Sequence, residues 1–440
     1  MNKFVAGLKG LLNFKLDFTQ RNIHPHMKDI YCLIIIFSVA GTFLFYQIPG
    51  EIGDDGVTHG IIAMSINNAR ESNSSVSALF EDLVSVSNEK MTPVHALQRM
   101  TLGNPLWHLL LSISFSIFGA SVFSTLALSS FIGLLTIISV YFLGKEMSNR
   151  LTGLLAALLL SSSLFFILHT RSGSGFIALV PLTVVSSIYF FYLAHKRMNR
   201  RLLWISGIAI SICIFNGYTP VFLLPPILIV FVIWKVNFRS LIKSVFSRRS
   251  VGEKNDHNLF SITEYLLTGG LSFGIFLLIT IVFSIYILED PLATFSHILG
   301  ERSQQTSLLT YDRYGFDRSI VLNANIRRFL GDMFIAVKNT DSLQGAHTQH
   351  YLPGRPLIAP LASVFFIIGL ILSVKRRSVS DKLCLIWWFA TFISFSIHSG
   401  FIGRAAIVGA PVIYIIAAKA MVDLTRFFKG VNHLHISLKR

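Results

Sequence analysis

Long apolar runs separated by short polar segments are the sequence feature that most constrains the fold of this chain. The runs are roughly 17–25 residues long, the length at which an α-helix crosses the hydrocarbon layer of a bilayer. Only 14% of the 440 residues are charged, whereas a soluble protein carries about a quarter. The pattern therefore predicts an all-α polytopic membrane protein, because a helix satisfies its own backbone hydrogen bonds in lipid.

The positions of the 38 Lys and Arg residues, which give a formal net charge of +16, predict the orientation of the chain. Most of them lie between apolar runs, in segments such as 1–29, 195–201 and 235–262. Segments of this kind stay on the cytoplasmic side. No basic stripe interleaved with aromatic residues accompanies them, so nucleic-acid binding is not predicted. The three cysteines lie inside apolar runs, without metal-site spacing, which predicts small buried core residues.

The number of spans depends on the short apolar stretch 104–119, which has Pro105 near its start. If this stretch crossed the membrane, the basic segments 195–201 and 235–262 would lie outside. A re-entrant or interfacial helix keeps them inside and agrees with the positive-inside rule. We therefore predict about ten transmembrane helices, with interfacial or re-entrant helices in the first outer loop. The predicted spans are 30–48, 123–143, 151–168, 175–194, 202–217, 219–235, 264–288, 356–374, 383–398 and 404–421.

Three regions follow from this assignment. Residues 1–29 form a cytoplasmic N-terminal segment, 30–421 a transmembrane domain, and 422–440 a cytoplasmic basic tail. Two long loops, 49–122 and 289–355, lie on the outer face. Outer loops of this size on a rigid helical frame usually bind something, so both are candidate functional regions.

An acidic pair directly follows the first predicted span, in the sequence GDDGVTHGIIAMSI (53–66). A charge near hydrocarbon is costly, so Asp54 and Asp55 at a span exit indicate function, although an exposed acidic turn is the alternative. A carboxylate can act as a general base, or it can hold a divalent cation such as Mg²⁺ or Mn²⁺ beside a phosphate. His59, about one helical turn later, could act as a second base, as a metal ligand or as a polar residue at the interface.

Basic and aromatic residues at other outer span ends are candidates for binding a phosphate. Arg171 lies in the turn HTRSGSG (169–175), and the end of the loop 289–355 reads GAHTQHYLPGRPL. A guanidinium group grips phosphate through several donors, whereas a snorkelling arginine is the alternative at each position. Acids and arginines on one membrane face fit a phosphate-linked lipid substrate. The candidate binding residues are His59, Arg171, His347, His350, Tyr351, Arg355 and Arg404.

The order of these motifs resembles the GT-C superfamily of glycosyltransferases that use polyprenyl-phosphate sugars. The resemblance is carried by GDDGVTHGIIAMSI, then NPLWHLLLSISFSIFG, then a span followed by GKEMSNRLTGLLAALLLSSS. The later NTDSLQGAHTQHYLPGRPLIAPLASVFFIIGL is similar to a loop-to-span junction in bacterial members. The chain is most similar to the branch that holds protein O-mannosyltransferases and lipid A aminoarabinose transferases. The Trp-Trp-Asp signature of oligosaccharyltransferases is absent from the sequence.

This resemblance implies a GT-C-like fold and an inverting transfer at the outer face. The sugar, a hexose or pentose, would leave an undecaprenyl or dolichyl phosphate donor for a glycan, lipid or protein acceptor. The catalytic acid of the family falls on Asp54, and Asp55 stands where Glu is common. Arg171 lies in a turn where many relatives carry a second acid. The expected location is a bacterial inner membrane with the site facing the periplasm, although an endoplasmic reticulum protein would have the same pattern.

Three other functions are compatible with a polytopic chain. An O-antigen polymerase or ligase would place catalysis in the loop 289–355 and leave Asp54 dispensable. A transporter or flippase for lipid-linked glycans would carry charges in mid-span, yet the predicted spans are nearly free of them. A non-catalytic scaffold would leave the acidic pair unexplained. The glycosyltransferase hypothesis accounts for the most features and leaves the sugar, the acceptor, metal dependence and oligomeric state open.

Overall fold

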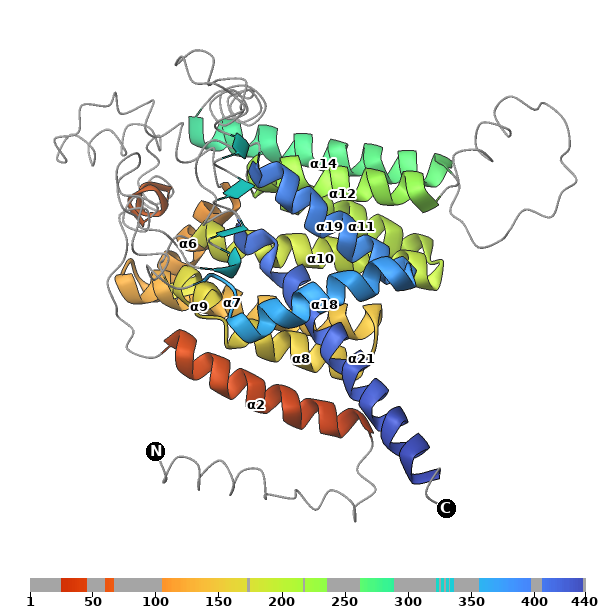
Figure 1. Ribbon diagram of the computed structural model, residues 1–440. Helices are drawn as coiled ribbons and strands as arrows, with labels where there is room; N and C mark the ends of the chain where they lie inside the picture. The colour runs from red at the N-terminus through yellow and green to blue at the C-terminus, as the bar shows by residue number, and fades with distance from the viewer. Residues whose placement is uncertain are drawn as a thin grey trace, which may run out of the picture.

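The bundle is built around helix α7 (Val122–Met147), which contacts helices from several parts of the chain (Figure 1). The structure is a computed structural model. It describes residues 25–45, 60–66, 105–171, 175–216, 218–235, 262–288, 356–396 and 406–437, and short helical pieces at 322–323, 326–327, 330–331 and 333–335.

All the regular elements in these ranges are helical, which confirms the all-α prediction. Long apolar segments form them, and side-chain caps start several, such as Asn149, whose Oδ1 accepts a hydrogen bond from the Thr152 amide at 3.0 Å. The helices besides α7 are α2 (Pro25–Phe45), α6 (Pro105–Phe118), α8 (Arg150–Ser161), α9 (Leu164–Arg171), α10 (Gly175–Arg197), α11 (Arg200–Phe215), α12 (Tyr218–Lys235), α14 (Ile262–Leu288), α18 (Pro360–Arg376), α19 (Val379–Ser396), the 3-10 turn η4 (Ala406–Val408) and α21 (Ala410–Ser437).

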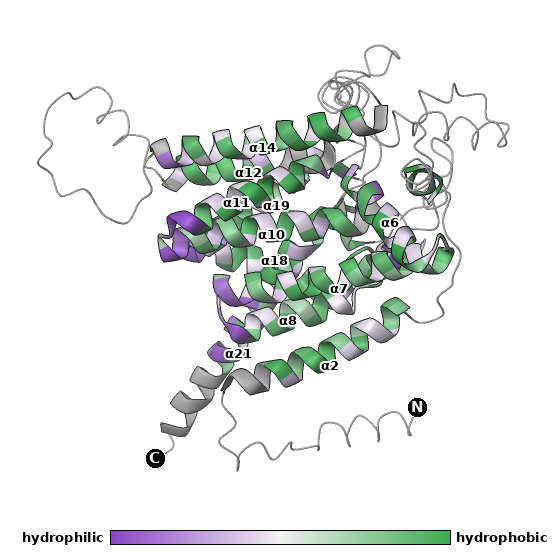
Figure 2. Cartoon of the chain, turned by 180° about the vertical axis from the view of Figure 1, so that it is seen from behind, coloured by the Kyte–Doolittle hydropathy of each residue, from purple (hydrophilic) through white to green (hydrophobic). Residues whose placement is uncertain are grey.

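The two ends of the bundle differ in polarity. The turns after α7, α10 and α18 gather at one end, where hydrophilic residues concentrate (Figure 2), and we call this the basic end. Ion pairs join helix ends there: Glu146 of α7 pairs with Lys196 of α10 at 2.8 Å, and Arg200 of α11 pairs with Glu264 of α14. The opposite end holds α6 and the last turn of α9, and we call it the α6 end (Figure 1). The basic end is the one that the positive-inside rule places in the cytoplasm.

The described helices agree with the prediction that residues 104–119 do not cross the membrane. The hydroxyl of Ser130, near the start of α7, donates a hydrogen bond at 3.0 Å to the carbonyl of Leu44, near the end of α2. The chain therefore leaves α2 and re-enters α7 at the same end of the bundle. Helix α6 lies between them in sequence and is short and apolar.

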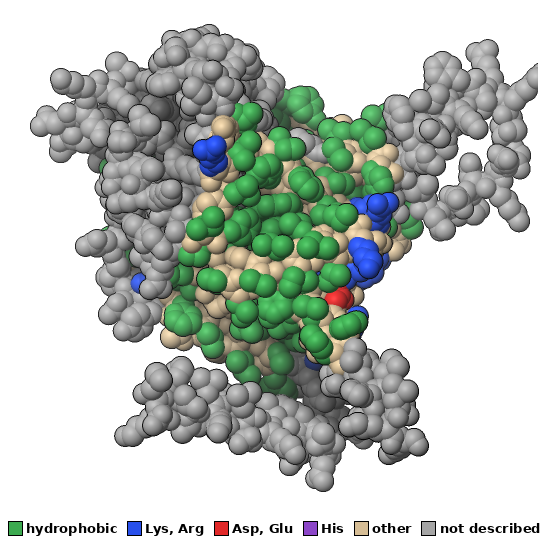
Figure 3. Space-filling model, in the orientation of Figure 1, with side chains coloured by type: hydrophobic (Ala, Val, Ile, Leu, Met, Phe, Trp, Pro, Cys, Tyr) green, Lys and Arg blue, Asp and Glu red, His purple; other side chains and the backbone are tan. Residues whose placement is uncertain are grey.

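Three described helices are long and apolar enough to span a bilayer: Val122–Met147, Leu179–Arg197 and Glu264–Phe283. Helices α8 and α9 together would provide a fourth. The face of the described bundle seen in Figure 3 carries a broad apolar band, with most of the visible Lys and Arg side chains along one edge. The chain is a multi-pass integral membrane protein, and the number ten stays a prediction.

The predicted span 151–168 is not a single helix, because the structure divides it into α8 and α9 with a bend of 60°. Three consecutive serines cause the break. The hydroxyls of Ser161 and Ser162 donate back to the carbonyls of Leu158 and Leu159, at 2.9 and 3.1 Å. Such back-bonding competes with the helical ladder. Ser163 then starts α9 by accepting a hydrogen bond from the Phe166 amide at 3.3 Å.

Two further predictions need correction. The last span was predicted to begin at 404 and end at 421, but α21 begins at Ala410, after η4, and continues to Ser437. An ion pair between Asp423 and Arg376 of α18 holds this polar continuation against the bundle. Cys32 is exposed on α2, whereas Cys213 and Cys384 are buried as predicted. An apolar span has a lipid-facing side as well as a core side, and Cys32 lies on the former.

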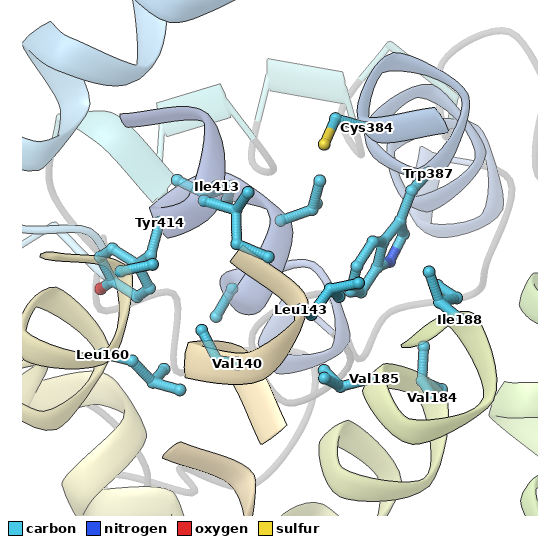
Figure 4. Close-up of a cluster of buried hydrophobic side chains, with 14 of the residues drawn as sticks. Val140, Leu143, Leu160, Val184, Val185, Ile188, Cys384, Trp387, Ile413 and Tyr414 are labelled. Carbon is cyan, nitrogen blue, oxygen red and sulfur yellow. The ribbon is translucent and has the colours of Figure 1, made fainter. Parts of the chain in front are cut away.

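The core lies where α21 passes between α7, α8, α10, α18 and α19. Residues 407–420, from η4 into α21, are buried without interruption. Figure 4 shows Ile413 and Tyr414 of this segment together with Val140 and Leu143 of α7 and Trp387 of α19. Because so many elements contact one segment, the direction of α21 fixes the directions of its neighbours.

A buried cluster of charges closes this core toward the basic end. Asp381, at the start of α19 and before the apolar run 383–398, is 1% exposed and accepts a hydrogen bond from Lys419 of α21 at 2.5 Å. It also accepts from Ser378 at 2.5 Å and from Arg376 and Ser373, both at 3.2 Å. Burial alone would raise the pKa of the Asp381 carboxyl, but these hydrogen bonds and positive charges outweigh burial and hold the pKa below its usual value.

We expect the change Asp381→Ala to destabilise the protein by about 3–5 kcal/mol, because it leaves the Lys419 ammonium buried without its counter-ion. The measurement is the midpoint of thermal unfolding in detergent. The matched control is Glu146→Gln at the same end. The partners of Glu146, Lys196 and Arg197, have side chains that are 46% and 57% exposed, so this change should cost no more than about 1 kcal/mol. Equal losses in both variants would contradict the assignment.

Candidate functional site

Four residues of α7, Ser129, Ser130, Ile132 and Gly133, hold together the segments that carry the candidate site, and we call them the α7 junction. The hydroxyl of Ser130 donates to the Leu44 carbonyl in the last turn of α2. The hydroxyl of Ser129 donates to the Thr170 carbonyl in the last turn of α9. The last carbonyls of a helix have no intrahelical partner. Two adjacent serines thus satisfy the ends of two different helices.

Gly133 brings α9 still closer to α7. A Cβ atom at this position would overlap the Cγ2 methyl of Thr170, which is fully buried. Thr170 is in turn fixed by its own hydroxyl, which donates to the Phe166 carbonyl at 2.7 Å. The absence of a side chain at Gly133 therefore allows the end of α9 to pack directly on α7.

Ile132 connects the junction to the residues after the acidic pair. Residues 60–66 are helical, and Ala63 is packed in a buried cluster with Ile132, Trp107 of α6 and Leu179 of α10. Ala63 is fully buried. The helix that was predicted to lie along an interface is therefore seated on α6, α7 and α10.

The described residues on either side of the acidic pair are attached to the α7 junction. Leu44, before the pair, is held by Ser130, and Ala63, after it, is packed in the cluster around Ile132. Asp54 and Asp55 themselves lie outside the described residues, as does His59.

Arg171 is the predicted binding residue that the structure describes, and it is the last residue of α9. It is partly exposed and directly follows Thr170, the partner of Ser129. One residue further back, His169 is fully buried with its Nδ1 2.8 Å from the Phe165 carbonyl. A carbonyl only accepts, so this nitrogen carries the proton. Arg171 therefore lies next to the junction to which the described residues before and after the acidic pair are attached.

The remaining predicted site residues lie outside the described residues, but described neighbours follow two groups of them. The Ile358 amide, soon after Arg355, donates to the Met333 carbonyl at 3.0 Å. Arg404 precedes η4, whose Ile407 and Val408 are buried. The predicted residues without a described position are His347, His350, Tyr351, Arg355 and Arg404.

Sequence reasoning missed the residues that build the junction. Ser129, Ser130 and Gly133 lie within the predicted span 123–143 and Tyr414 within the predicted span 404–421, and the sequence patterns singled out none of them. The available signal was the run of small and polar side chains in one otherwise apolar segment, which is typical of close helix contacts in membranes. Within the described residues, no group of three or more His, Cys, Asp or Glu is arranged to hold a metal ion. A cation at Asp54 and Asp55 stays a prediction.

Comparison with known proteins identifies relatives of part of the chain. Residues 103–248, from α6 to beyond α12, match the family described as dolichyl-phosphate-mannose-protein mannosyltransferase. An uncharacterized protein of Aquifex aeolicus is 28% identical over 142 residues, which are 32% of this chain and 28% of that protein.

Solved structures share the fold over most of the chain. The Archaeoglobus fulgidus oligosaccharyltransferase in its apo form is 17% identical, with a TM-score of 0.57 over 94% of this chain and 53% of that one. ArnT from Cupriavidus metallidurans bound to undecaprenyl phosphate is 14% identical, with a TM-score of 0.55 over 88% of this chain and 59% of that one. The archaeal enzyme in complex with an inhibitory peptide and a dolichol-phosphate is 17% identical, with a TM-score of 0.51 over 92% of this chain and 52% of that one.

The predicted resemblance to the GT-C superfamily is confirmed by these matches. The fold is shared with an oligosaccharyltransferase as well as with ArnT, although the Trp-Trp-Asp signature is absent from this sequence. The chain spans about half the length of the solved relatives that it matches.

We expect Gly133→Ala to lower the thermal midpoint, because the new methyl overlaps the Thr170 methyl and forces α9 away from α7. Overpacking of this kind costs about 1–3 kcal/mol. The double variant Gly133→Ala with Thr170→Ser removes the opposing methyl, keeps the hydroxyl, and should recover most of the loss. Gly41→Ala is the matched control, since nothing lies within 4 Å of a Cβ there. If the double variant does not recover stability, the overlap between the two methyl groups is not the cause of the loss.

Proposed function

We propose that this chain, which has the GT-C fold, is a membrane glycosyltransferase that moves a sugar from a polyprenyl phosphate to an acceptor at the α6 end of the bundle. The observation that carries the proposal is the α7 junction, which contacts Leu44 before the acidic pair, Ala63 after it, and Thr170 beside Arg171. A carboxylate pair and a guanidinium near a membrane surface are the groups that a phosphate leaving group and an acceptor hydroxyl require.

In the proposed reaction the acceptor oxygen attacks the anomeric carbon of the donor sugar. Asp54 takes the proton from the acceptor, and the bond between the anomeric carbon and the phosphate oxygen breaks. The polyprenyl phosphate leaves with its charge balanced by Arg171, assisted by Arg355 and Arg404. A single displacement of this kind inverts the anomeric configuration. Asp55 supports Asp54, or joins it in holding a divalent cation that neutralises the phosphate.

A lipid carrier for the sugar is supported by the solved relatives. Their structures contain dolichol-phosphate in one case and undecaprenyl phosphate in another. The apolar outer surface of the described helices provides the lipid contact that a polyprenyl chain needs (Figure 3). In this chain His59, His347, His350 and Tyr351 are proposed to contact the donor or the acceptor.

The orientation of the bundle supports an active site on the non-cytoplasmic face. Lys145, Lys196 and Arg200 lie at the basic end, opposite α6 and Arg171. By the positive-inside rule the basic end faces the cytoplasm. We therefore place the reaction on the outer face, in a bacterial inner membrane at the periplasmic side.

We expect Asp54→Asn to reduce kcat for sugar transfer by about 100–10,000-fold, the range that a positioned general base contributes. The assay follows radiolabelled sugar from a polyprenyl-phosphate pool to any acceptor in membranes. Binding of the donor should change little, because the amide has the same shape. Asp55→Asn, assayed in parallel, shows which of the two carboxylates is the general base.

Normal transfer by both variants would overturn the assignment. It would favour a polymerase or ligase that acts through the loop 289–355, and the next variants would be His347→Ala, His350→Ala and Arg355→Ala. Equal expression of each variant, measured by detergent extraction, is the necessary control.

A second prediction concerns Arg171. Arg171→Gln should raise KM for the donor by about 10–100-fold, since hydrogen bonds to a charged group contribute about 1.5–3 kcal/mol. Arg171→Lys keeps the charge but loses the forked donor geometry, and should fall between wild type and Arg171→Gln. Arg201→Gln, an exposed arginine at the basic end, is the matched control and should leave KM unchanged. An unchanged KM in Arg171→Gln would remove this residue from the donor site.

A further inference from the structure

The bend between α8 and α9 is held by a residue from the C-terminal part of the chain. The hydroxyl of Tyr414 in α21 donates a hydrogen bond to Ser163 Oγ at 2.7 Å. Tyr414 is 1% exposed and Ser163 is 3% exposed. Figure 4 shows Tyr414 on the side of α21 that lies against Leu160 of α8. The contact therefore joins the two elements at the point where the helix breaks.

This hydrogen bond selects one direction for α9. Ser163 Oγ also accepts from the Phe166 amide, so the same oxygen starts α9 and binds α21. A buried tyrosine hydroxyl without a partner costs about 1–3 kcal/mol. Only a bend that presents Ser163 to Tyr414 avoids that cost, because the two side chains are enclosed by the core.

Helix α9 acts as a short lever from this bend to the candidate site. It runs from Leu164 to Arg171, which at about 1.5 Å per residue gives a length of about 12 Å. A change of about 10° in its direction would move the far end by about 2 Å. A displacement of that size is enough to break a hydrogen bond between a guanidinium group and a phosphate.

The far end of α9 has its own attachment on α7. Ser129 donates to the Thr170 carbonyl, and Gly133 packs against the Thr170 side chain. The position of the start of α9 is thus set by α21, and the position of its end is set by α7. Helix α21 is itself held in place, since Lys419, five residues after Tyr414, donates a hydrogen bond to Asp381.

We propose that Tyr414 and Ser163 are positioning residues, which set the direction of α9 and thereby hold Arg171 at the donor phosphate. The inference rests on the proposed function and adds to it a residue from the C-terminal helix that does not itself touch the substrate. It assigns a role to a buried hydroxyl that packing alone does not require, since a phenylalanine would fill the same space.

The test compares Tyr414→Phe with wild type in the transfer assay. We expect KM for the polyprenyl-phosphate sugar to rise about 3–10-fold, the effect of one hydrogen bond, with kcat within about twofold. Tyr141→Phe is the matched control, because Tyr141 is also buried in the core, on the part of α7 far from Ser129. It should leave KM unchanged.

A double-mutant cycle separates positioning from general destabilisation. In an Arg171→Gln background, Tyr414→Phe should cause no further rise in KM, because the group that it positions is already absent. Additive effects of the two changes would overturn the proposal. Hydrogen exchange of the α9 amides provides a readout that does not depend on activity, and Tyr414→Phe should speed exchange there by about fivefold or more.

The outcomes distinguish the two proposals. A wild type that neither transfers sugar nor binds polyprenyl phosphate overturns the proposed function and this inference together. An active wild type whose KM is unchanged by Tyr414→Phe overturns the inference and leaves the proposed function intact. A selective rise in KM that disappears in the Arg171→Gln background supports both.

Discussion

The structure depends on how helix ends are satisfied inside a membrane protein. A helix that ends within the bundle leaves carbonyl groups without partners, and lipid offers them none. Ser129 and Ser130 of α7 supply hydroxyl donors to two such ends, the last turns of α9 and α2. Because the two serines are adjacent, the two helix ends are brought to one level of α7. Short polar side chains in an apolar helix thus determine where irregular backbone can occur.

The contacts between helices differ at the two ends of the bundle. At the basic end, ion pairs join neighbouring helices, as between Glu146 and Lys196 or between Asp381 and Lys419. At the α6 end, hydrogen bonds from serine hydroxyls and packing of apolar side chains join the helices. Different interactions thus hold the helices together at the two ends of the bundle.

Sequence periodicity and charge predicted much of this fold, and particular residues explain where they failed. Run length and the positive-inside rule predicted the helices, and their exclusion of α6 from the spans agrees with the contact between Ser130 and Leu44. The bend at Ser161–Ser163 was missed, since hydropathy does not register competition between serine hydroxyls and backbone amides. The continuation of α21 beyond 421 was missed because an ion pair from α18, distant in sequence, stabilises it.

The residues of the candidate site also differ in how far the sequence alone could indicate them. Arg171 was proposed from the sequence because a charged residue at a span end stands out in an apolar sequence. Tyr414 could not be found, since its partner Ser163 is 251 positions away and neither residue is unusual in its own segment. The connection exists because α21 returns through the core between helices from the first half of the chain. In a bundle of this kind, the residues that bind a substrate can be read near the span ends, whereas those that orient them depend on which helices the last segment contacts. By the proposed positioning of Arg171, the C-terminal helix takes part in the site mechanically, although its described residues contribute no charged group to the α6 end.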